Sequence, residues 1–198
     1  MSSFVFALVG TIALVICIGC LLILHFVPSG LHPARDPVSL YGTTRYHLLY
    51  RVQVIASGIA ALCLVAALTE RHLSLPLVGL LMLVCYAIAR LAIAAFMMDA
   101  HGKRTPTGSM HILLAAVAFT TVAVATGILT PSLLSSSLWK DLSVFLSVAE
   151  YLTLLSALLF LLVSLLPVLR PFYGLIERGI YVGALCWLAL VIIPLLLR

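Results

Sequence analysis

The sequence predicts an all-α integral membrane protein, built as one bundle of six transmembrane helices with a short interfacial helix in the first long loop. Of its 198 residues, 64% are hydrophobic and only 9% are charged, so few polar groups remain to solvate an exterior. The apolar residues come in runs of about 20, the length that a helix needs to cross about 30 Å of hydrocarbon. We therefore expect a single transmembrane domain over residues 1–198.

The first apolar run covers residues 4–26. It has no cationic start and no small-residue cleavage site, so we expect it to be a retained first span and not a cleaved signal peptide. The segment Pro28-Ser29-Gly30 ends this run.

The connection over residues 27–49 contains a helix-start pattern, Asp36 followed by Pro37. Asp caps free N–H groups, and Pro suits the first helical position. We expect a short interfacial helix from Pro37 to about Tyr46. The side chains of Tyr41, Tyr46 and Tyr50 would lie at headgroup depth, where amphipathic rings collect.

Five more apolar runs predict the remaining spans, over residues 50–68, 75–98, 110–129, 142–166 and 179–197. The last opens with Gly179 and Gly183, a spacing that permits close helix contact. Six spans place both termini on one side of the membrane. The alternate connections, residues 27–49, 99–109 and 167–178, then share the other side and form a polar face.

Asp99 and His111 flank the densest polar run of the chain. We expect Asp99 at the C-terminal end of its helix, where the dipole disfavours an anion, and His111 in the first turn of the next, where it disfavours an imidazolium. A neutral imidazole is what a metal ligand or a general base requires. The alternative is that these groups form only a solvated rim.

Arg90 lies inside the third expected span, about eight residues and hence about 12 Å from its end. A charge at that depth costs about 3 kcal/mol, so such residues usually face the bundle and have a partner. We expect Arg90 to pair with Glu150 or a ligand, or to extend toward the polar face.

Together these positions predict one polar pocket that opens at the membrane surface, with Arg90 as its floor. Its expected lining residues are Asp36, Asp99, His111, Glu177 and Arg178. Candidate ligands for a divalent metal are His101, His111, Asp99 and Asp36, although no fixed ligand motif occurs.

Three interpretations of function follow. In the first, the polar face binds a small ligand, a lipid headgroup or a partner subunit of a larger membrane complex. In the second, the protein is an intramembrane hydrolase or transferase acting on lipid, with or without a metal. In the third, a haem is ligated by His25, His47 or His111. No nucleophile–base pair at a fixed spacing is present, which favours the first interpretation and leaves enzymatic activity open.

The net charge of +5 is spread over short connections and forms no long basic block. This distribution is typical of topology signals and of contact with anionic lipid headgroups, and it argues against nucleic acid as a partner. Membrane lipids are the expected partners.

Several motifs, taken in order, resemble a known pattern: Asp36-Pro37-Val38-Ser39, then Asp99, Thr107-Gly108 and His111, then Glu177-Arg178. The pattern is similar to that of the bacterial and archaeal membrane family called domain of unknown function 998, and it covers nearly the whole chain. The resemblance implies a six-helix protein with cytoplasmic termini and no stated activity. It marks six residues: Asp36, Ser39, Asp99, His111, Glu177 and Arg178.

We expect a multi-pass protein of the inner (plasma) membrane. The polar face and its helix ends hold seven cationic residues, Arg35, Arg45, Arg51, Lys103, Arg104, Arg170 and Arg178. The terminal side holds three, Arg71, Lys140 and Arg198. The positive-inside rule alone would make the polar face cytoplasmic. Several of these arginines lie beside acids, so we follow the resemblance and expect cytoplasmic termini.

Overall fold

Long helices dominate the computed structural model, which describes residues 3–100, 105–163 and 165–197. They are α1 (Ser3–Phe26), α2 (His47–Glu70), α3 (Leu77–Ile93), α4 (Pro106–Leu134), α5 (Ser143–Leu162) and α6 (Tyr173–Ile192). Short 3-10 helices, η1 (Val38–Thr43), η2 (Lys140–Leu142) and η3 (Pro167–Phe172), precede α2, α5 and α6, and the short α7 (Pro194–Leu197) ends the described chain. The described residues contain no strand, as the sequence predicts.

Five helical segments of the described chain are long and apolar enough to cross a membrane: Ser3–Phe26, His47–Glu70, Pro106–Leu134, Lys140–Leu162 and Pro167–Leu197. The apolar helix α3 is shorter, with 17 residues. Large apolar side chains such as Phe26, Leu77 and Val144 remain exposed on the outside of the bundle. This exterior is that of a protein whose solvent is lipid.

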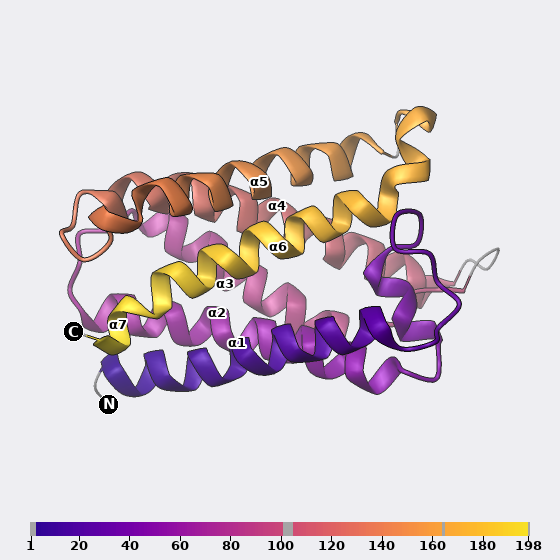
Figure 1. Cartoon of the computed structure of the whole chain (residues 1–198), viewed down its shortest axis with the longest axis horizontal. Helices are drawn as coiled ribbons and strands as arrows, with labels where there is room; N and C mark the ends of the chain where they lie inside the picture. The colour runs from indigo at the N-terminus through magenta and orange to yellow at the C-terminus, as the bar shows by residue number, and fades with distance from the viewer. Residues whose placement is uncertain (1–2, 101–104, 164, 198) are drawn as a thin grey trace.

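Consecutive long helices pack side by side, and α6 returns to lie against α1, α2 and α4 as well as α5. Figure 1 shows both chain termini at one end of the bundle. At the other end lie η1, η3 and the start of α6. The start of α6 therefore lies beside the long connection between α1 and α2 (Figure 1).

Small residues set the contact between α5 and α6. A side chain at Gly179 would collide with Ser156, and one at Gly183 would collide with Thr153 and lie 2.9 Å from the carbonyl oxygen of Ala149. The predicted glycine spacing thus marks a real close approach of two helices.

The third helix ends at Ile93, whereas the sequence predicts a span that runs to residue 98. Residues 94–96 make one tight turn, and the carbonyl oxygen of Phe96 then accepts a hydrogen bond from His111. Arg90 consequently lies in the last turn of α3, and the predicted depth of eight residues is wrong.

The last long helix starts at Tyr173, six residues earlier than the sequence predicts. Pro167 and Pro171 suit the short helix η3 that leads into it. Glu177 and Arg178 lie within the first turns of α6 and find their partners there, so the expected loop over residues 167–178 is shorter.

The segment that was expected to be an interfacial helix is the 3-10 helix η1, which is capped by Pro37 without a side-chain hydrogen bond. Asp36 does not cap it; its Oδ2 accepts from the backbone N–H of His32 at 2.7 Å. Tyr41 and Tyr50 are each only 1% exposed, so both side chains pack inside the bundle end.

Candidate functional site

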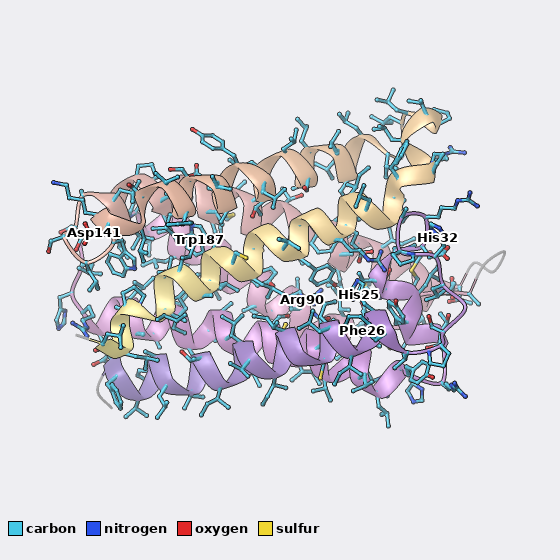
Figure 2. All side chains as sticks on the ribbon, in the orientation of Figure 1. His25, Phe26, His32, Arg90, Asp141 and Trp187 are labelled. Atoms are coloured by element: carbon cyan, nitrogen blue, oxygen red, sulfur yellow. The ribbon has the colours of Figure 1, made fainter. Side chains whose placement is uncertain are left out.

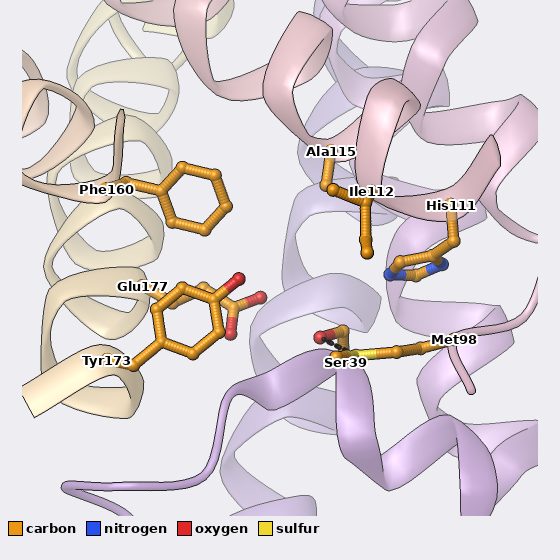
Figure 3. A pocket seen from close by; sticks show the side chains of 8 residues that line it. All are labelled: Ser39, Met98, His111, Ile112, Ala115, Phe160, Tyr173 and Glu177. Atoms are coloured by element: carbon orange, nitrogen blue, oxygen red, sulfur yellow. Dashed lines mark hydrogen bonds between the residues drawn. The ribbon is translucent and has the colours of Figure 1, made fainter. Parts of the chain in front are cut away.

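A small cavity lies at the polar end of the bundle, between α4 and α6 and against η1. Figure 3 shows its polar and sulfur-bearing side chains: Ser39, Met98, His111, Tyr173 and Glu177. Apolar side chains, among them Phe160, complete the wall. The cavity leaves about 10 Å³ for the centre of a water-sized sphere. That is room for about one water molecule.

Glu177 forms one wall of the cavity and is only 2% exposed. It lies on the inner face of α6, and its Oε2 accepts a hydrogen bond from the backbone N–H of Val38 at 2.6 Å. This bond ties η1 to α6. The carboxylate faces the cavity (Figure 3).

His111 forms the opposite wall and is also 2% exposed. Its Nδ1 lies 2.7 Å from the carbonyl oxygen of Phe96. Because a carbonyl oxygen only accepts, Nδ1 carries the proton, and Nε2 of the neutral ring carries a lone pair. Figure 3 shows a ring nitrogen on the cavity side.

Ser39 and Met98 close the cavity between these walls. The Ser39 hydroxyl donates to Met98 Sδ at 2.9 Å, and Ser39 is 6% exposed. The hydroxyl is therefore directed at a thioether and not at a base that could activate it.

Asp99 has a different place from the one predicted. It lies six residues beyond the end of α3, and its carboxylate accepts from the backbone N–H and the hydroxyl of Thr105, both at 2.7 Å. Thr105 in turn caps α4 by accepting from Gly108 N–H. The carboxylate thus lies at a helix N-terminus, where the dipole favours an anion. It is not among the residues that line the cavity.

Arg178 clamps the loop over residues 31–36 to α6. Its Nη1 donates to the carbonyl oxygens of Pro33, Asp36 and Gly174 at 2.6, 2.8 and 2.9 Å, and its Nε donates to His25 Nε2 at 2.8 Å. Its Nη2 is buried and has no hydrogen-bond partner among the described residues. The backbone of Asp36 therefore belongs to this clamp.

Arg90 is 1% exposed and lies in the bundle interior, as Figure 2 shows. Its guanidinium donates to Ser57 Oγ at 2.8 Å, Tyr181 OH at 2.9 Å and Gln53 Oε1 at 3.0 Å. The expected partner Glu150 lies beside Thr130 of α4 instead. Arg90 is not among the cavity-lining residues, so the cavity floor is formed by other groups.

The structure thus brings together Ser39, His111 and Glu177, and it separates them from Arg90, Asp99 and Arg178. Tyr173, Tyr181 and Gln53 were not among the predicted site residues. A sequence signal for two of them exists, since Tyr173, Glu177 and Tyr181 are spaced by four and share one face of α6.

The structure describes three of the four candidate metal ligands, Asp36, Asp99 and His111. Among the described residues, no group of three or more His, Cys, Asp and Glu side chains is placed to hold a metal ion. Asp36 and Asp99 bond the backbone of their own loops. His101 lies outside the described residues.

The three histidines proposed as haem ligands make other hydrogen bonds or lack space for a haem. His25 Nε2 accepts from Arg178, and its Nδ1 bonds the Leu21 carbonyl. His47 Nδ1 lies 3.3 Å from the Thr44 carbonyl oxygen. His111 faces a cavity of water size, which a porphyrin exceeds many times over.

A bundle of long apolar helices with an apolar exterior and a polar end defines the class: this is a polytopic α-helical membrane protein. Within that class, residues 11–194 match the family model described as protein of unknown function (DUF998). The chain belongs to this family. Neither a curated protein nor a solved structure matches it.

Proposed function

We propose that this protein spans the membrane six times and binds one small polar ligand at its polar end, with Glu177 and His111 as the recognition groups. One observation carries the proposal. Two polar side chains, each 2% exposed and from different helices, face one cavity of water size.

The hydrogen-bonding chemistry of the two walls supports a ligand there. His111 Nδ1 donates to the Phe96 carbonyl oxygen, which leaves the lone pair of Nε2 on the cavity side. The Glu177 carboxylate lies across from it and only accepts when ionised. A ligand that donates hydrogen bonds to both groups fits this pair.

The sequence analysis leaves three kinds of ligand open: a small molecule, a lipid headgroup and a partner subunit. The size of the cavity favours the first. About 10 Å³ for the centre of a water-sized sphere suits a single small molecule or ion. A lipid headgroup or a segment of a partner subunit is much larger. The alternative of a lipid hydrolase, in which Asp and His groups activate water, is less favoured, because a cavity of this size has no room for a lipid substrate.

The sixth span in this proposal is α3. Its 17 residues extend about 26 Å, close to the about 30 Å of a bilayer core. It packs between α2 and α4, which are both long enough to span. Six spans agree with the position of both termini at one end (Figure 1). We place the protein in the plasma membrane with cytoplasmic termini, and labelling of cysteines introduced at Ser29 and Ser137 in intact cells tests this.

The ligand site is tested with ammonium, a donor of hydrogen bonds, against potassium, an ion of nearly equal radius that donates none. We expect ammonium to raise the melting temperature of the purified protein above that in potassium at equal ionic strength. Glu177→Gln and His111→Gln should remove the difference. Glu150→Gln and His72→Gln, outside the cavity, should keep it. Equal melting temperatures in both salts for the wild-type protein would refute the site.

A further inference from the structure

The walls of the cavity carry two hydrogen-bond acceptors and one hydroxyl. His111 Nε2 has its lone pair on the cavity side, because Nδ1 donates to Phe96. The ionised Glu177 carboxylate accepts only. The Tyr173 hydroxyl can donate or accept and lies on the same wall as Glu177 (Figure 3).

This set fits a water molecule. A buried water typically makes about three hydrogen bonds, and it needs a cavity of roughly one water-sized sphere. Its two O–H bonds would serve His111 Nε2 and Glu177, and its oxygen would accept from Tyr173. The three groups meet the first requirement, and the cavity volume of about 10 Å³ meets the second.

We infer that Glu177, His111 and one bridging water form a unit that binds a single exchangeable proton inside the membrane protein. This rests on the proposed ligand site and names its occupant, water together with the proton that water carries.

The proton moves within the unit without any other reactant. When His111 is doubly protonated, its Nε2–H bond breaks as that proton passes to the water oxygen. One water O–H bond breaks at the same time, and its proton forms a new O–H bond on Glu177. The products are neutral His111, protonated Glu177 and water, and the net charge is unchanged.

Other titratable and charged groups surround this unit from each neighbouring element. Arg90 of α3, Arg178 and Tyr181 of α6 and Tyr50 of α2 lie near Glu177, and Asp99 lies near His111. The two arginines are held by neutral acceptors, Gln53, Ser57 and Tyr181 for Arg90 and carbonyl oxygens for Arg178. Neither donates directly to Glu177 in the described structure, which leaves Glu177 available to the water.

The test is a pH titration of the purified full-length protein in nanodiscs, followed by infrared difference spectroscopy of carboxyl groups. We expect a protonated-carboxyl band that Glu177→Gln removes and Glu150→Gln retains. His111→Gln should shift the pH midpoint of that band by about one unit or more, because strongly coupled groups titrate as a pair. Tyr173→Phe, which removes one partner of the water, should move the band frequency while the protein stays folded.

A Glu177 band with the same midpoint in wild type and in His111→Gln would overturn the inference. If ammonium still raised the melting temperature of the wild-type protein in that case, the small-ligand site would stand without proton sharing. If ammonium had no effect on the wild-type protein and the band were also uncoupled, both the ligand site and the proton sharing would be refuted.

Discussion

The carboxylate of Glu177 accepts a hydrogen bond from the backbone N–H of Val38 at 2.6 Å, across 139 positions of the chain. The adjacent residue, Arg178, binds the carbonyl oxygens of Pro33 and Asp36. Two neighbouring side chains of opposite charge thus hold the same segment of the α1–α2 connection. Glu177 accepts from one of its backbone N–H groups, and Arg178 donates to two of its carbonyl oxygens. This segment, residues 33–38, leads directly into Ser39, which lines the cavity together with Glu177, and we call it the cover.

Arg178→Gln should loosen this cover. The substitution removes the donor of three carbonyl oxygens and of His25 Nε2, and hydrogen bonds from a charged group contribute about 1.5–3 kcal/mol each. We expect faster hydrogen–deuterium exchange over residues 31–43 and a stability loss of at least about 3 kcal/mol, since glutamine can replace some of the four bonds. Arg178→Lys should not restore it, because an ammonium lacks the planar fork.

The matched control is Arg35→Gln, an exposed arginine in the same segment. It should leave exchange unchanged. Equal exchange in Arg178→Gln and Arg35→Gln would show that Arg178 does not hold the segment.

Asp99→Ala should destabilise the start of α4 without altering the cavity. The carboxylate accepts two hydrogen bonds from Thr105, the capping residue. Loss of a cap costs about 0.5–2 kcal/mol. We expect a loss of about 1–2 kcal/mol in SDS-induced unfolding and an unchanged response to ammonium. Asp141→Ala, at the opposite end of the bundle, serves as control (Figure 2). Loss of the ammonium response in Asp99→Ala would return Asp99 to the ligand site.

The long spans could be predicted from the sequence, because run length and hydropathy are local properties. The positions of polar groups relative to each helix end could not. Arg90 was placed too deep, since α3 ends at Ile93 and the chain then turns, so that the Phe96 carbonyl oxygen accepts from His111. Asp99 was assigned to the wrong helix end for the same reason: its partner, Thr105, belongs to the next helix.

His111 and Glu177 were predicted as site residues, and both line the cavity. Their role as ligand groups stays a prediction. Met98 was missed because nothing in its local sequence distinguishes it from the apolar residues before it. Tyr173 was missed because the sequence predicts a loop over residues 167–178, so its four-residue spacing from Glu177 indicated no shared helix face. Tyr41 is buried at the bundle end, where its ring centroid lies 6.2 Å from that of His25, a contact that the sequence does not predict. Such long-range contacts are determined by how the segments pack and leave no local periodic signal.

Arg90→Met should destabilise the bundle strongly. It leaves Ser57, Tyr181 and Gln53 buried without their shared donor, at about 1–3 kcal/mol for each group. We expect a loss of at least about 3 kcal/mol in SDS-induced unfolding. Arg90→Lys should recover only part of this, because one ammonium cannot reach three acceptors in the guanidinium geometry. Arg170→Met, at an exposed position, should change stability by less than about 0.5 kcal/mol. A similar effect at both arginines would contradict the interior role of Arg90.

Gly183→Ala should separate α5 from α6. The added methyl would meet the Thr153 side chain and lie 2.8 Å from the Thr153 backbone nitrogen, and backbone cannot shift cheaply. Overpacking of this kind costs about 1–3 kcal/mol. The control is Gly19→Ala in α1, where no heavy atom lies within 4 Å of the new methyl. That variant should gain about 0.5–1 kcal/mol from helix propensity. Unfolding curves that rank the two variants in the opposite order would refute the close contact.

The most direct test of the central claim is an experimental structure of the full-length protein in nanodiscs, at a resolution that shows ordered water. The account predicts density for one bound water-sized species within about 3 Å of both Glu177 and His111 Nε2. The account also predicts that this density is absent from the structure of Glu177→Gln while the helices keep their positions. A cavity filled by neighbouring side chains, or His111 turned so that Nε2 faces away from Glu177, would contradict it.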